Sequence, residues 1–106
     1  MARTPIHPGE ILAGELQEIN ISGAELARKL GVPQNRISQI LTGKRSITAD
    51  TALRLGRYFG TTPEFWMNLQ RSYDLDLAAQ RMGSALSRIP QRPVTSIARH
   101  RGRRSA

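Results

Sequence analysis

The chain has 106 residues, which is the length of one domain with one modest hydrophobic core. Its 16 Lys and Arg outnumber its 8 Asp and Glu, and the net charge of +8 favours a polyanionic partner such as nucleic acid, although a basic surface can also serve solubility alone. Cysteine is absent, which excludes disulfides, thiolate nucleophiles and thiolate metal sites. No segment has the apolar run of a signal peptide or a membrane span, so we expect a cytoplasmic protein that enters no membrane.

The charge is concentrated at the C-terminal end of the sequence. Residues 88–106 hold six arginines and no acidic residue, whereas residues 1–87 hold ten basic and eight acidic residues, a net charge of +2. From Pro90 onward Pro, Arg and Ser dominate, a composition that cannot bury enough apolar surface to fold. We therefore expect an N-terminal arm over residues 1–7, a folded domain over 8–83 and a basic, disordered tail over 84–106. The tail is expected to add sequence-independent DNA affinity; folding onto a partner and a purely solubilising role are the alternatives.

Helix-starting and helix-ending residues divide the folded domain into five helices, and no segment has the alternating pattern of a strand. The first helix is expected over 8–19, where Pro8 suits the first turn and His7 is a capping or surface residue. The second, over 23–30, starts at a capping box of Ser22 and Glu25 and stops at Gly31, where a tight turn requires positive φ. The third is expected over 34–42.

The fourth and fifth helices are each preceded by a threonine. Thr48 should cap a helix over 49–59, and Thr62 a helix that starts at Pro63 and fades between residues 79 and 83. On the fifth helix Phe65 and Trp66 are expected to cover the core, which leaves other apolar residues for a partner subunit. The predicted dimer surface consists of Trp66, Leu69, Tyr73, Leu75 and Leu77. Burial of the whole stripe within one chain is the alternative.

Helices 23–30 and 34–42 have the spacing of a helix-turn-helix, with a small or apolar residue at each position where the two helices must meet: Leu26, Ala27, Leu30, Gly31, Val32, Ile37 and Ile40. The opposite side of the helix at 34–42 carries short polar side chains, and no acidic residue occurs from Gly31 to Thr48. An ordinary solvated helix would show Glu and Lys there, whereas amides, hydroxyls and guanidinium groups can read base edges in a major groove. We predict base contacts by Gln34, Asn35, Arg36, Ser38 and Gln39, and DNA-backbone contacts by Ser22, Thr42, Lys44 and Arg45.

The stretch "ISGAELARKLGVPQNRISQILTGKR" resembles the helix-turn-helix of bacteriophage repressors and their large family of transcription regulators. In that family the residues that match Gln34, Asn35 and Gln39 touch bases. Two positions depart from the pattern: Gly23 stands where several repressors carry a glutamine that meets the DNA backbone, and Pro33 where a serine often caps the helix. The resemblance implies an all-α, five-helix, lambda-repressor-like domain.

The flanking motifs "HPGEIL" and "TALRLGRYFGTTPEFWMNLQRSYDL" resemble the HigA antitoxins of bacterial toxin–antitoxin operons, and the resemblance covers about residues 5–80. It implies a homodimer that binds a palindromic operator at its own promoter and silences a HigB-like toxin, a ribosome-dependent mRNA endonuclease. A repressor that shares this fold and has no toxin partner is the alternative. An enzyme is disfavoured, because His7 and His100 lack a plausible catalytic neighbour, and no cofactor or metal site is expected.

Overall fold

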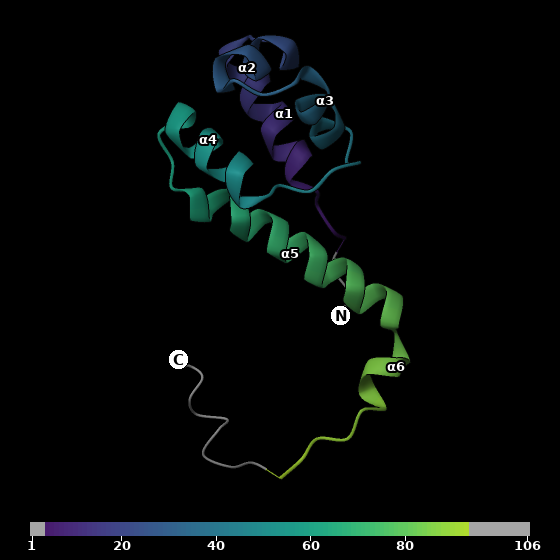
Figure 1. The fold of residues 1–106 in the computed structure, drawn as a ribbon. Helices are drawn as coiled ribbons and strands as arrows, with labels where there is room; N and C mark the ends of the chain where they lie inside the picture. The colour runs from purple at the N-terminus through teal and green to yellow at the C-terminus, as the bar shows by residue number, and fades with distance from the viewer. Residues whose placement is uncertain (1–3, 94–106) are drawn as a thin grey trace.

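The computed structural model describes residues 4–93, which form six α-helices and no strand (Figure 1). The helices are α1 (Pro8–Ile19), α2 (Gly23–Leu30), α3 (Gln34–Leu41), α4 (Ala49–Phe59), α5 (Pro63–Met82) and α6 (Ser84–Ser87). The first five confirm the sequence prediction, except that α3 ends one residue earlier, with Thr42 as its C-cap. The sixth was not predicted. The start of the expected arm, residues 1–3, and most of the expected tail, residues 94–106, lie outside the described residues.

Helices α1 to α4 pack around one another, and α5 passes along one side of this bundle (Figure 1). The second half of α5, followed by α6, extends away from the bundle, and every residue from 78 to 93 is exposed. None of the helices in the described part of the chain is long and apolar enough to cross a membrane.

The core draws on all of the first five helices and on the loop before α4. Its buried residues are Leu12, Leu16, Leu26, Ala27, Leu30, Ile37, Ile40, Ile47, Ala52, Leu55 and Trp66. Trp66 is 1% exposed, and its indole N–H donates a hydrogen bond to the Thr61 hydroxyl at 2.9 Å. Because the ring is enclosed by its own chain, the prediction that Trp66 also belongs to a dimer surface is wrong.

Two other large apolar side chains reach the surface, and one of them, Phe65, was expected to cover the core. Phe65 is 42% exposed. Adjacent residues of a helix point in different directions, and on α5 it is Trp66 that points into the core. Leu53 on α4 is 60% exposed and lines an open groove with Tyr58. The side of α4 that faces the core carries Ala52 and Leu55, which are buried.

The helix caps differ in part from those predicted. Ser22 accepts a hydrogen bond from the Glu25 amide, but the reciprocal bond of a capping box is absent there. A complete capping box instead starts α1, between His7 and Glu10. Thr62 caps α5 as expected by accepting from the Phe65 amide, whereas Thr48 stands at the start of α4 without a side-chain capping bond.

The start of α1 touches α3 with no space between the two backbones. A Cβ atom at Gly9 would overlap the carbonyl oxygen of Ile40, so only glycine permits this approach. The contact sets the position of α3 relative to α1, and it gives a steric reason for the glycine in the "HPGE" motif.

Candidate nucleic-acid interface

Helix α3 buries one side and exposes the other. Ile37 and Ile40 are completely buried against the other helices, while Gln34 and Asn35 are exposed at the start of α3. Within the described chain no side-chain hydrogen bond occupies the amide of Gln34 or Asn35, so both present a donor and an acceptor to solvent. Pro33 precedes them without a side-chain cap, as its departure from the family pattern implies.

The two hydroxyls on the exposed side of α3 donate to the helix itself. Ser38 Oγ donates to the Asn35 carbonyl at 3.3 Å, and Thr42 Oγ1 donates to the Ser38 carbonyl at 3.1 Å. Their oxygen lone pairs remain open, but their protons are engaged in this conformation. A direct hydrogen bond from either hydroxyl to a phosphate or a base acceptor therefore requires rotation of the hydroxyl.

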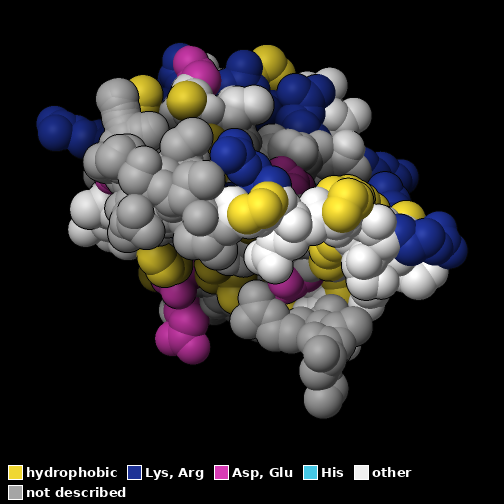
Figure 2. All heavy atoms as spheres, turned by 90° about the horizontal axis from the view of Figure 1, so that it is seen from below, with side chains coloured by type: hydrophobic (Ala, Val, Ile, Leu, Met, Phe, Trp, Pro, Cys, Tyr) yellow, Lys and Arg dark blue, Asp and Glu magenta, His cyan; other side chains and the backbone are white. Residues whose placement is uncertain are grey.

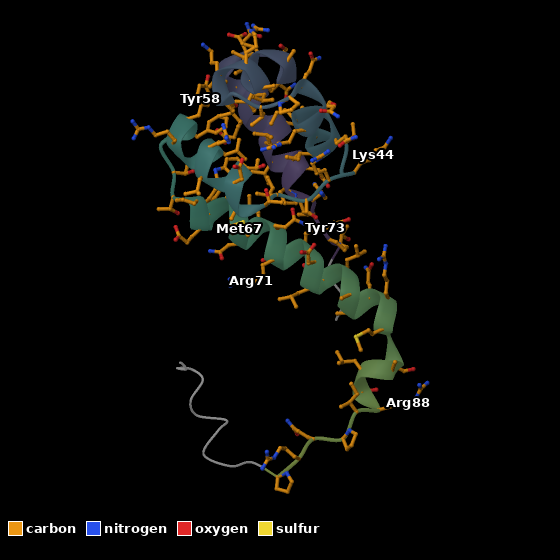
Figure 3. All side chains as sticks on the ribbon, in the orientation of Figure 1. Lys44, Tyr58, Met67, Arg71, Tyr73 and Arg88 are labelled. Carbon is orange, nitrogen blue, oxygen red and sulfur yellow. The ribbon has the colours of Figure 1, made fainter. Side chains whose placement is uncertain are left out.

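Gln39 is joined to the residue pair that follows α3. Arg45 Nε donates to Gln39 Oε1 at 2.9 Å, which leaves the amide nitrogen of Gln39 as its open donor. Lys44 and Arg45 are both exposed, and Figure 3 shows Lys44 projecting outward from the loop between α3 and α4. The predicted base-contacting and phosphate-contacting groups thus meet at the end of α3.

Arg36 is directed toward α4. Its guanidinium lies 2.8 Å from Asp50 Oδ1, and Arg54 Nε donates to the same oxygen at 2.8 Å. Two hydrogen bonds lower the pKa of the Asp50 carboxyl below its ordinary value, and the bond from Arg54 has a larger effect than the bond from Arg36. The carboxyl is therefore ionised at neutral pH. A base contact by Arg36 stays a prediction, and it would require the guanidinium to leave Asp50.

The start of α2 offers a hydroxyl donor. Ser22 is exposed, and because its oxygen accepts from the Glu25 amide its proton remains available to a phosphate. The next residue, Gly23, lies against α3, where an added Cβ would stand 2.9 Å from Leu41 Cδ1 and 3.5 Å from Ile37 Cγ2. A larger residue at position 23 would therefore require the end of the Leu41 side chain to move.

Two buried polar residues hold the loop between α3 and α4, and the sequence did not reveal either role. Gln70 on α5 is 5% exposed; its Oε1 accepts from the Ile47 amide at 2.7 Å, and its Nε2 donates to Asp74 at 2.9 Å. His7 is 7% exposed, packs beside Gly43 of the loop and interacts electrostatically with the backbone of Arg45. The partners are 23 residues apart in one case and 38 in the other, so no local pattern could have indicated them.

The predicted dimer surface on α5 is exposed only in part. Leu69 and Tyr73 are half-buried, because Leu69 packs on the core and Tyr73 on His7; Leu77 is also half-buried, whereas Leu75 is 63% exposed. Further along, Met82, Leu86 and Ile89 are also exposed. Seen from the side of α5 and α6, hydrophobic side chains reach the surface in several places among Lys and Arg (Figure 2).

No group of three or more His, Asp or Glu side chains suited to a metal ion occurs within residues 4–93. The features that the fold brings together are the exposed polar side of α3, the two cations after it and the uncapped start of α3. This is the arrangement expected of a helix-turn-helix reading double-stranded nucleic acid.

Comparison with known proteins agrees with this arrangement. The family model described as helix-turn-helix matches residues 14–66. The virulence-associated protein I of Dichelobacter nodosus is 51% identical over 76 residues, which cover 71% of this chain and 70% of that protein. The structure of an addiction module antidote protein of the HigA family from Coxiella burnetii is 52% identical with a TM-score of 0.83, and the match covers 87% of this chain and all of that one.

A second solved structure, the Pseudomonas aeruginosa antitoxin HigA with the higBA promoter, is 46% identical with a TM-score of 0.81. It matches 86% of this chain and all of that chain. The chain belongs to the helix-turn-helix family of transcription regulators, in its HigA antitoxin branch. The fold and the family expected from the sequence are thereby confirmed.

Proposed function

We propose that the chain is an antitoxin that represses its own operon as a homodimer and neutralises a HigB-like toxin in the cytoplasm. The observation that carries the DNA-binding part is the exposed side of α3, with free amides on Gln34 and Asn35, no acidic residue from Gly31 to Thr48, and Lys44 and Arg45 directly after it. The similarity to the solved structure of an antitoxin with the higBA promoter supports the same interpretation.

In this proposal Gln34, Asn35 and Gln39 contact bases, with Ser38 and Arg36 beside them. Asn and Gln can pair with adenine through two hydrogen bonds, and an amide donor can also meet an acceptor on guanine. Lys44, Arg45, Ser22 and Thr42 contact phosphates, which fix the position of α3 in the groove and carry no sequence information.

The test begins with selection of an operator by the wild-type protein from a pool of random duplexes. Asn35→Ala or Gln39→Ala should then cost about 1–3 kcal/mol on the selected site and relax the preference at one base pair. Lys44→Ala should weaken binding to selected and scrambled duplexes alike and reduce the slope of log affinity against log salt by about one. Gln17→Ala, on the exposed side of α1, is the control and should bind as wild type does. Unchanged binding by an Asn35→Ala/Gln39→Ala double variant would reject the assignment.

The toxin partner rests on membership of the HigA branch and is tested in cells. We expect the open reading frame adjacent to this gene to stop growth when expressed alone and growth to recover when this chain is co-expressed. The Asn35→Ala/Gln39→Ala variant should still restore growth while losing repression of a promoter reporter, because DNA and toxin would bind different surfaces. A repressor without a toxin partner is the alternative, and a harmless neighbouring reading frame together with intact repression would favour it.

A further inference from the structure

The loop of residues 42–48 between α3 and α4 carries three of the proposed phosphate contacts, Thr42, Lys44 and Arg45. A loop that is already fixed loses less conformational entropy when its side chains bind phosphates, so the contacts that support this loop affect DNA affinity. In this chain two buried side chains support the loop: Gln70 accepts from the Ile47 amide at 2.7 Å, and the His7 ring packs beside Gly43 and interacts with the backbone of Arg45.

Three contacts position the His7 ring, and the first of them requires a ring nitrogen without a proton. Its Nδ1 accepts from the Gly9 amide at 2.9 Å, so the ring proton of the neutral form sits on Nε2. The ring meets Tyr73 of α5 edge to face, with ring centroids 4.8 Å apart at 72°. It also packs beside Gly43, where an added Cβ would stand 3.8 Å from His7 Cγ.

The contacts continue from the loop to the base-contacting side of α3. The backbone of Arg45 interacts with His7, which packs beside Gly43 two residues earlier, and the Arg45 side chain donates to Gln39 Oε1 at 2.9 Å. A continuous series of contacts therefore runs from Tyr73 on α5 through His7 and Arg45 to Gln39. In Figure 3, Tyr73 lies on the same side of α5 as the bundle, while Lys44 projects from the loop above it.

We propose that His7 is a positioning residue for DNA binding, which holds the loop so that Lys44 and Arg45 face the phosphates and Arg45 orients Gln39. This inference rests on the proposed function, because it assigns His7 a role only if α3 and its loop meet DNA. His7 itself is buried and contacts no DNA in this account. Its effect is transmitted through the Arg45 backbone.

The variant His7→Asn separates this role from helix capping. Asparagine is a favoured N-cap residue and can still accept from the Gly9 amide, but it is too short to reach the Arg45 backbone and lacks a ring to meet Tyr73. Leu16→Val is the control: it removes one buried methylene from α1, far from the loop, and lowers stability without touching the DNA-binding residues. Both variants are compared with wild type under conditions where all three are folded by circular dichroism.

We expect His7→Asn to weaken binding to the selected operator by about five- to tenfold and to reduce the salt slope by about one to two, since two phosphate contacts lose their fixed positions. Leu16→Val should stay within about twofold of wild type with an unchanged slope. In a Lys44→Ala/Arg45→Ala background, adding His7→Asn should cost much less than it does alone, because the residues through which it acts are gone.

The outcomes distinguish this inference from the function on which it rests. If wild type selects no operator, the proposed function fails. If wild type binds its operator and His7→Asn behaves as Leu16→Val does, or if its effect is fully additive with Lys44→Ala/Arg45→Ala, the DNA-binding function stands and the role of His7 is overturned.

Discussion

At the scale of single residues, two glycines of α1 lie in opposite surroundings. An added Cβ at Gly9 would overlap the Ile40 carbonyl oxygen, whereas one at Gly14 would have nothing within 4 Å. Both glycines lie in the same helix. Replacing each by alanine therefore compares the same substitution with and without a neighbouring backbone, and the difference in stability measures the effect of the close contact between α1 and α3.

We expect Gly9→Ala to lower the free energy of unfolding by about 2 kcal/mol or more, because α1 must move away from α3 and disturb the core. Gly14→Ala should raise it by about 0.5–1 kcal/mol, since alanine is the better helix former and meets no neighbour. Urea unfolding of the two variants measures both effects. Equal changes at the two positions would contradict the account of the α1–α3 contact.

Burial lowers the pKa of His7 below its ordinary value of 6.5, against the opposing effects of the Glu10 and Asp74 carboxylates and the interaction with the Arg45 backbone. The folded protein therefore prefers neutral His7 more strongly than the unfolded chain does. This contribution to stability is complete above the unfolded pKa and is lost as pH falls below about 6.5.

The free energy of unfolding should accordingly decrease from pH 6.5 toward pH 5, by at most about 1.4 kcal/mol per pH unit for this one proton. His7→Asn should show a flatter dependence over the same window, because it removes the titrating ring while it keeps the cap of α1. Urea unfolding at several pH values measures the difference. Equal slopes for the two proteins would show that His7 is not the responsible group.

At the scale of secondary structure, the first five helices were predictable because their ends are marked locally. Pro8 and Pro63 start α1 and α5, while Gly31 and Gly60 end α2 and α4 with φ of 73° at each glycine. The short α6 has no such marker and was missed. Local signals therefore gave the order and bounds of the helices of the domain.

The contacts between elements were not predictable in the same way, because they join residues far apart in the chain. The Arg36–Asp50 pair spans 14 residues, and the hydrogen bond from Ile47 to Gln70 spans 23. Both change the site: one draws Arg36 away from the exposed side of α3, and the other fixes the loop that carries Lys44. The spacing of polar and apolar side chains indicated which face of α3 is exposed. It did not indicate which residues of α4 and α5 contact Arg36 and the loop after α3.

The Arg36–Asp50 pair yields a prediction about DNA affinity. Asp50→Asn removes a carboxylate beside the proposed interface and releases Arg36, so binding to selected and scrambled duplexes should strengthen severalfold at low salt. Stability should change little, because the pair is exposed. Glu18→Gln, at the end of α1, is the matched loss of one negative charge and should have a smaller effect. Weaker operator binding by Asp50→Asn would instead mean that Asp50 holds Arg36 in its useful position.

At the scale of the whole molecule, the second half of α5 and α6 leave the bundle and carry apolar side chains that their own domain does not cover (Figure 1). Leu75, Met82, Leu86 and Ile89 are 63%, 41%, 51% and 61% exposed. A domain with a complete core of its own has no need of these residues. Pairing with a second copy across a two-fold axis would cover them. A dimer that reads a palindromic operator must hold its two α3 helices about 34 Å apart.

We therefore expect the 11.8 kDa chain to sediment at about twice its mass at micromolar concentration. Leu75→Asp should shift it toward the monomer, because a carboxylate would be buried in the apolar contact between copies. Leu53→Asp is the matched control: Leu53 on α4 is 60% exposed, close to the exposure of Leu75, but it lies away from α5 and should leave the dimer intact. Dissociation by both variants, or by neither, would place the contact elsewhere. A wild type that sediments only as a monomer would reject the dimer itself, and with it the two-fold reading of a palindrome.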